Sequence, residues 1–311
     1  MNSTHFKWEG RFDGDTPEHC RIFQMINQQA LADFTLLGFA SDEGIRRNKG
    51  RLGAKNGPDH IRSQLASMPV HRPFSLNDIG DITCNNEDLE LAQKNLAKAI
   101  SELLHDKSLP IVLGGGHEIA FGSFQGVFNH LQTIQENFQL GIINFDAHFD
   151  LREADIVTSG TPFLNAANLS KTHNIDFNYL CLGIAEHANT KVLFETADQL
   201  DVTYILDKEL TSSSLKMSAT LEKLQTFINH VDYLYITVDL DVFSASIAPG
   251  VSAPAARGIS LEAFEILFDT ILASKKVILL DIAECNPQWD IDNRTAKLAA
   301  WIVYQYINNR L

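Results

Sequence analysis

Short apolar runs recur along the chain, and their spacing constrains the fold more than any other feature. The runs are rich in Val, Ile and Leu, as is typical of strands buried on both faces. They lie at 35–40, 110–115, 140–145, 179–184, 202–206, 232–238 and 276–280. Amphipathic segments of helical length lie between them, among them 88–106, 214–230, 260–274 and 292–308. This alternation predicts an α/β fold with three α/β/α layers and a mostly parallel central sheet.

The sequence favours one domain covering residues 1–311. A chain of 311 residues that is 45% hydrophobic is long enough to bury one large core. No internal repeat and no Pro/Gly/Ser-rich linker divides it. Residues 1–34, with Trp8 and Phe12 among polar side chains, form an N-terminal extension to which the sequence assigns no role.

Charge and composition exclude several kinds of partner. The formal net charge of −14 argues against nucleic acid and anionic membranes, which are bound through surplus Lys and Arg. No apolar run approaches the roughly 18 residues of a membrane span, and the polar N-terminus does not resemble a secretory signal. The cysteines, which show no CxxC spacing, are Cys20, Cys84, Cys181 and Cys285. A cytoplasmic protein without disulfides is expected.

Polar side chains gather where the predicted strands end. The triplet Asp146, His148 and Asp150 follows one strand at every second position, and Asp239 and Asp241 do the same after another. Residues two apart on extended backbone face the same side. His117 and Glu284 follow two further strands. Because ligand sites in parallel sheets form beyond the carboxyl ends of the strands, we expect all these groups to meet in one crevice.

The composition of this cluster predicts two metal ions. Its four aspartates would repel one another strongly at low dielectric unless cations neutralised them. Carboxylates with a few imidazoles and no thiolate suit manganese better than structural zinc, although cobalt, nickel and zinc stay open. A bridged ion pair holds water as hydroxide near neutral pH, so the predicted chemistry is hydrolytic.

Each motif also has a simpler interpretation. The Asp-x-His-x-Asp triplet is compatible with a capped strand end, the Asp239–Asp241 pair with a surface turn, and the glycine-rich segment before His117 with a tight turn. Glu284 is compatible with a solvated strand end. Their coincidence after successive buried strands favours the metal site. Complete motifs for dinucleotide or triphosphate binding and for a serine nucleophile are absent from the sequence.

Four segments in this order resemble the metal-binding motifs of the ureohydrolase (arginase and agmatinase) superfamily. They are GGGHE (114–118), NFDAHFD (144–150), VDLDVF (238–243) and DIAECNP (281–287). The resemblance covers roughly residues 35 to 308 and implies an arginase-like three-layer fold with two Mn²⁺ ions per subunit. It also implies a possible homo-oligomer, since members of the superfamily are commonly trimers or hexamers.

The resemblance also implies roles for individual residues. One manganese would be held by His117, Asp146, Asp150 and Asp239, and the other by Asp146, His148, Asp239 and Asp241. Asp150 would also relay a proton to the leaving amine, and Glu284 would pair with the amidine nitrogen of the substrate. Such a pair is a charge-assisted hydrogen bond. Ser159 occupies the position of a histidine that arginases carry, which weakens an arginase assignment.

Three further segments are similar to the formimidoylglutamase branch of the superfamily. They are DEGIRRNKGRLGAKNGP (42–58), TSGTPF (158–163) and APGVSAPAARG (248–258). That branch hydrolyses N-formimidoyl-L-glutamate to L-glutamate and formamide in histidine degradation. The small-molecule substrate would carry two carboxylates, for which arginines are the expected partners. Candidate substrate-binding residues are Arg152, Arg46, Arg47, Arg51 and Ser159, together with Glu284; Arg257 is a weaker candidate.

Two alternatives remain open at this stage. The same chemistry acting on arginine, a guanidino acid or agmatine would release urea instead. A non-catalytic relative that binds metal or a partner without turnover is the other. The presence of all six predicted ligands and of Glu284 argues against the second alternative.

Overall fold

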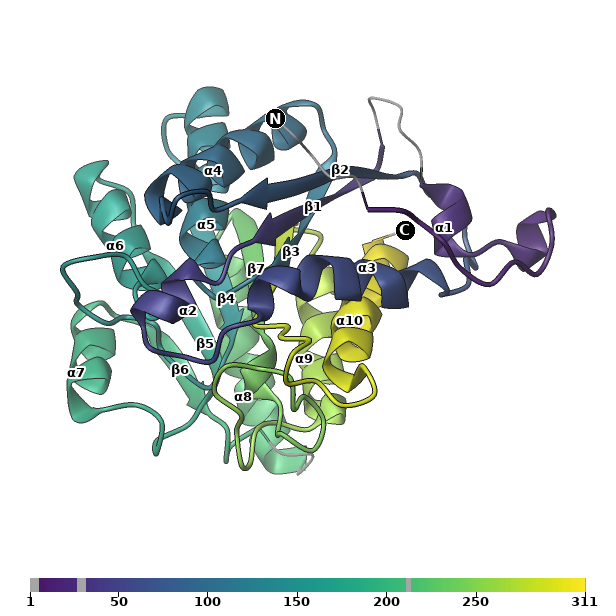
Figure 1. Ribbon diagram of the computed structural model, residues 1–311. Coiled ribbons are helices and arrows are strands. Elements are labelled where there is room, and N and C mark those ends of the chain that lie inside the picture. Colours follow the sequence, from purple (N-terminus) through teal and green to yellow (C-terminus); the bar gives the residue numbers. More distant parts are fainter. Residues whose placement is uncertain (1–5, 27–31, 211–213, 311) are drawn as a thin grey trace.

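The computed structural model describes residues 6–26, 32–210 and 214–310. Its eight strands form one sheet (Figure 1). All neighbouring strands pair in parallel, in the order β2-β1-β3-β8-β7-β4-β5-β6. The strands are β1 Phe34–Ala40, β2 Leu76–Thr83, β3 Leu109–Gly114, β4 Leu140–Phe145, β5 Asn178–Ile184, β6 Thr203–Leu206, β7 Tyr233–Asp239 and β8 Val277–Ala283. The predicted α/β class and parallel sheet are confirmed.

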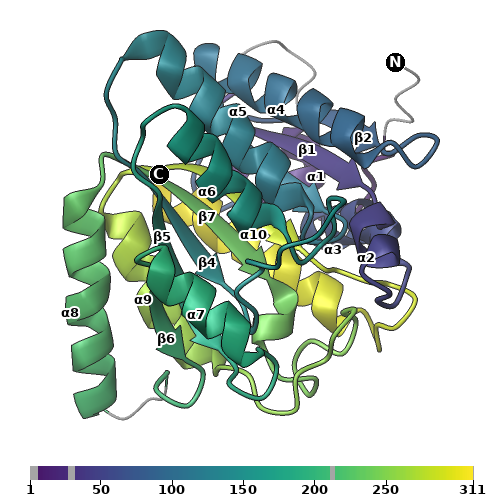
Figure 2. The same cartoon turned by 90° about the vertical axis from the view of Figure 1, so that its left-hand side faces the viewer.

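Helices cover both faces of the sheet and complete the three layers (Figure 2). One face is packed by α4 Leu89–His105, α5 Ile119–Ile134, α6 Pro162–Thr172 and α7 Lys191–Gln199. The other is packed by α3 Gly57–Ala66, α8 Ser214–His230, α9 Leu261–Ala273 and α10 Arg294–Arg310. The short helices are α1 Ile22–Met25 and α2 Glu43–Arg47, with 3-10 turns at Pro17–His19, Ala54–Asn56 and Leu240–Val242.

Local sequence explains where the longer helices begin. The Asp88 carboxylate accepts a hydrogen bond from the Leu91 N–H at 3.0 Å, and the Ser260 hydroxyl accepts one from Ala263 at 3.2 Å. These side chains satisfy amide groups that the first turn leaves without partners. The four helices expected from the sequence form within two residues of the expected bounds. Within the described part of the chain, no helix is both long and apolar enough to cross a membrane.

Strand β2, Leu76–Thr83, was not predicted from the sequence. Its sequence, LNDIGDIT, has no apolar run because this strand lies at the sheet edge and buries only Leu76 and Gly80. Two of its carboxylates, on Asp78 and Asp81, bind the fully buried guanidinium of Arg62 in α3 at 2.9 and 2.6 Å. The polar residues that interrupt the apolar pattern of this strand therefore attach it to the helix layer.

Candidate metal centre

The polar groups predicted from the sequence meet at the carboxyl edge of the sheet. His117 lies in the loop after β3, the Asp146–Asp150 segment follows β4, Asp239 ends β7, and Glu284 directly follows β8. Those four strands stand side by side in the sheet, in the order β3-β8-β7-β4, and their parallel direction brings these loops together. The structure thus assembles in one place side chains that lie far apart in sequence.

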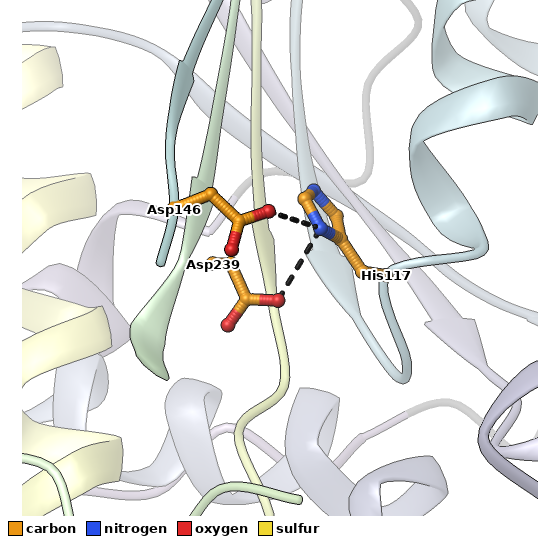
Figure 3. A group of neighbouring side chains, drawn as sticks. All are labelled: His117, Asp146 and Asp239. Carbon is orange, nitrogen blue, oxygen red and sulfur yellow. Dashed lines mark ion pairs between the residues drawn. The ribbon is translucent and has the colours of Figure 1, made fainter. Parts of the chain in front are cut away.

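Asp146 lies between two groups of potential ligands. Its Oδ2 is 3.1 Å from His117 Nδ1, which is also 3.0 Å from Asp150 Oδ2 and 3.3 Å from Asp239 Oδ2. Figure 3 shows the carboxylates of Asp146 and Asp239 facing the same ring nitrogen of His117. The other oxygen of Asp146, Oδ1, is 3.5 Å from His148 Nδ1. Each oxygen of this carboxylate therefore faces a different imidazole.

The second group adds Asp241. His148 Nδ1 lies 3.1 Å from Asp241 Oδ2. One potential ligand atom from each of Asp146, His148 and Asp241 lies within 4.8 Å of the others, and the same holds for His117, Asp146 and Asp239. The two groups share Asp146, as a binuclear centre with a bridging carboxylate requires.

The donor atoms of His117 fit a bound cation better than a closed hydrogen-bond network. Its Nδ1 is buried and makes no hydrogen bond of acceptable geometry, although three carboxylate oxygens lie around it. Its Nε2 lies 3.0 Å from the hydroxyl of Thr237. A hydrogen bond at Nε2 favours the tautomer in which Nδ1 keeps a free lone pair for a metal.

The electrostatics of the cluster also favour cations. Burial by itself would lower the pKa of His117, but the facing carboxylates raise it well above its ordinary value. Burial raises the pKa of Asp241 well above its ordinary value, and the charge of Asp239 adds to the effect. The pKa of Glu284 is raised well above its ordinary value for the same two reasons. These shifts show how strongly the crowded carboxylates favour added positive charge.

Backbone geometry shapes the same loops. Asp150 and Glu284 both have positive φ angles, 48° and 68°, which non-glycine residues seldom adopt. Asn189, in the segment after β5, accepts from the N–H of Phe149 at 3.1 Å and donates to the carbonyl of Ala147 at 2.8 Å. It thereby supports the Asp146–Asp150 segment in its turn, a role that no sequence motif signals.

A cavity of about 260 Å³ opens over the metal-site groups. From the predicted set it is lined by His117, His148, Asp150, Asp239, Asp241, Glu284, Arg152 and Ser159. Residues that the sequence analysis did not single out also line it, notably Asn48, Asn189 and Ser252. A larger cavity of about 770 Å³ lies at the opposite, amino edge of the sheet near Asn178 and Thr203, away from this chemistry.

The three arginines of the loop after β1 do not line the cavity, in contrast to what the sequence analysis expected. Arg46 and Arg47 bind Glu43, with Nε–carboxylate distances of 2.7 and 2.8 Å. Arg51 donates to the carbonyls of Val251 and Ser252. These guanidinium groups hold loops together. Carboxylates pair with Arg46 and Arg47, whereas Arg51 is held by backbone carbonyls.

Comparisons with known proteins agree with the fold and identify the family. The sequence profile of the Arginase family matches residues 32–308. Formimidoylglutamase of Vibrio vulnificus (strain CMCP6) is 44% identical, covering 98% of this chain and 96% of its own length. Formimidoylglutamase of Rhodococcus opacus (strain B4) is 40% identical, with 98% and 95% covered. A crystal structure of Trypanosoma cruzi formiminoglutamase with Mn²⁺ superposes with a TM-score of 0.80 at 24% identity, covering 93% of this chain and 98% of that one.

Proposed function

The chain belongs to the arginase family and is a metal-dependent amidine hydrolase, and we propose that its substrate is N-formimidoyl-L-glutamate. Water would replace the glutamate nitrogen on the formimidoyl carbon, giving L-glutamate and formamide. The observation that carries this proposal is the cavity in which Arg152 and Glu284 accompany the candidate metal ligands. A carboxylate and a guanidinium in one cavity match a substrate that has an amidine at one end and carboxylates at the other.

Six residues would hold the metal ions in this proposal. They are His117, Asp146, His148, Asp150, Asp239 and Asp241. Two divalent cations bound there would supply hydroxide near neutral pH and stabilise negative charge on the reacting centre. The oxygen-rich ligand set favours Mn²⁺, the metal named for the Trypanosoma cruzi structure.

Asp150 and Glu284 have separate tasks. Asp150 lies at the cavity wall, where its carboxylate can pass a proton to the departing amine of glutamate. Glu284 is buried, and its two oxygens accept from the backbone N–H groups of His117 at 3.2 Å and Ser252 at 3.3 Å. The remaining lone pairs of the carboxylate are available to the substrate amidinium, which would neutralise the negative charge of Glu284.

The wider setting of this proposal is a cytoplasmic step of histidine degradation. The names of the Vibrio vulnificus and Rhodococcus opacus relatives support the substrate, and the acidic composition agrees with a small-molecule partner. Four cysteines without disulfide partners in the structure agree with a reducing compartment.

A parallel end-point assay tests the proposal. Manganese-loaded protein is incubated with N-formimidoyl-L-glutamate, L-arginine and agmatine, and formamide, glutamate and urea are quantified. The expected result is formamide and glutamate in equal amounts from the first substrate alone. Urea from either of the others would reject the substrate while keeping the hydrolytic class. An Asp146→Asn variant, loaded in the same way, controls for contaminating hydrolases.

A further inference from the structure

Arg152 is the one candidate arginine that lines the cavity, and no carboxylate pairs with it among the described residues. Arg46 and Arg47 pair with Glu43, and Arg257 lies 3.4 Å from Asp207. Arg152 lines the cavity without a direct ion pair, so its guanidinium is available to an anionic group of a substrate.

The side chain of Asn48 holds this guanidinium. Arg152 Nη1 donates to Asn48 Oδ1, and Asn48 Nδ2 donates to the hydroxyl of Ser159 at 3.0 Å. A guanidinium contains only hydrogen-bond donors, so the amide oxygen of Asn48 must face it and the amide nitrogen must face Ser159. Asn48, from the loop after β1, therefore links two cavity-lining residues of the loop after β4.

Asn48 is itself fixed by the loop after β1. It caps the carboxyl end of α2, where its N–H donates to the Gly44 carbonyl at 2.9 Å. The N–H of Gly44 donates in turn to the buried carboxylate of Glu118 at 2.9 Å, next to the candidate ligand His117. The position of Asn48 is thus tied to the metal-site loop.

Arg47 also joins these two loops. It binds Glu43 in α2 and Glu90 in α4, and it donates to the carbonyl of Val157 at 3.1 Å. Val157 lies two residues before Ser159 in the loop after β4. The loops that carry Asn48 and Ser159 are therefore held together by Arg47 as well as by Asn48.

We infer that Asn48 is a positioning residue that holds Arg152 ready for a substrate carboxylate without cancelling its charge. An exposed arginine side chain has many rotamers, and fixing it before binding removes part of the entropy cost of association. A neutral amide suits this task because an aspartate at the same place would orient the guanidinium and also neutralise it. This inference rests on the proposed function in so far as the substrate carries a carboxylate.

A double-mutant cycle tests the inference. The KM and kcat for N-formimidoyl-L-glutamate are measured for manganese-loaded wild type, Asn48→Ala, Arg152→Ala and the double variant, with Asn229→Ala on α8 as a matched control. Asn48→Ala is expected to raise KM roughly three- to ten-fold, the factor that ordering one long side chain represents, with a much smaller change in kcat. In the Arg152→Ala background the same substitution should have no further effect on KM.

Asn48→Asp separates charge from shape. The variant is nearly isosteric and still accepts from Arg152, so a packing role would leave KM as in the wild type. We expect the KM of Asn48→Asp to rise at least as much as that of Asn48→Ala, because the aspartate neutralises the guanidinium of Arg152. Equal effects of Asn48→Ala in the presence and absence of Arg152, or a wild-type KM in Asn48→Asp, would overturn the inference. Metal content and melting temperature are compared with those of the Asn229→Ala control.

Failure of the proposed function gives a different pattern. If the wild type releases urea from L-arginine instead, the substrate proposal fails, and the same cycle is run with L-arginine, which also carries a carboxylate. Turnover of agmatine alone would overturn both, because agmatine has no carboxylate for Arg152 to bind. If no substrate is turned over, the affinity for L-glutamate is measured by calorimetric titration of wild type and Asn48→Ala. Weaker binding by Asn48→Ala supports the inference. Equal affinity of the two proteins, or no binding by either, overturns it.

Discussion

Glu284 Oε1 accepts a hydrogen bond from the backbone N–H of His117 at 3.2 Å. The carboxylate that we propose for the substrate amidine is thus also a support for the loop of a proposed metal ligand. Because β3 and β8 are neighbours in the sheet, this contact closes the gap between their two terminal loops. In the proposed function, substrate binding and metal binding would therefore be joined through one buried side chain.

Replacing Glu284 with glutamine should separate these two tasks. The amide oxygen can still accept from one backbone N–H, but the variant lacks the negative charge that pairs with an amidinium. We expect kcat/KM to fall about 10- to 100-fold, as for the loss of a charge-assisted hydrogen bond of about 1.5–3 kcal/mol. Steady-state kinetics and elemental analysis check this, and a large loss of metal in Glu284→Gln would contradict the assignment.

The shared position of Asp146 predicts different metal contents for two conservative variants. Asp146 faces both imidazoles, whereas Asp241 faces only His148. Asp146→Asn should therefore lose most of both ions, and Asp241→Asn should keep about one ion per chain in a binuclear site. Inductively coupled plasma mass spectrometry after gel filtration measures both. The same metal content in the two variants would show that Asp146 is not a bridging ligand.

Removal of the metals should make stability depend on pH. In the metal-free cluster, the pKa values of His117 and His148 are raised well above 6.5 because the effect of facing carboxylates exceeds that of burial. A raised folded-state pKa contributes stability that is fully present below the unfolded value and is lost as pH rises through the folded value. The raised pKa values of Asp241 and Glu284 act in the same direction.

The measurement for this prediction is the melting temperature of chelated protein at increasing pH, starting from about pH 6, just below the ordinary pKa of histidine. The chelated form should melt at progressively lower temperature as pH rises, and manganese should largely abolish the dependence. Parallel curves with and without manganese would show that these groups do not govern stability.

The buried Arg62 should be essential for attachment of the edge strand β2. Its side chain is fully buried and binds Asp78 and Asp81, so Arg62→Ala leaves two carboxylates without their cation. The expected loss is about 3–5 kcal/mol in the free energy of unfolding, as for breaking other buried ion pairs. Urea denaturation measures it. Asp59→Asn is the control, because Asp59 is 61% exposed at 3.4 Å from Arg62 and its loss should cost less than about 1 kcal/mol.

Much of the fold can be predicted from local sequence. Buried parallel strands need apolar residues on both faces, so β4 and β7 were recognisable as runs, and the alternation with helices indicated the layers. The candidate metal ligands were also recognisable, because Asp146, His148 and Asp150 stand at a fixed spacing directly after β4. Strand β2 was not, because an edge strand that binds a buried arginine does not need an apolar run.

The partners of the charged side chains were decided only by the tertiary structure. Arg47 and Arg152 are both candidate substrate ligands in sequence, yet Arg47 meets Glu43 and Glu90 while Arg152 meets a neutral amide at the cavity. Asn48 lies 104 residues from Arg152, and no local pattern indicates their contact. Sequence by itself determined which residues can carry charge and which strands must be buried. The folded chain decided which charges are cancelled and which remain available, because a charge is neutralised by its neighbours in space.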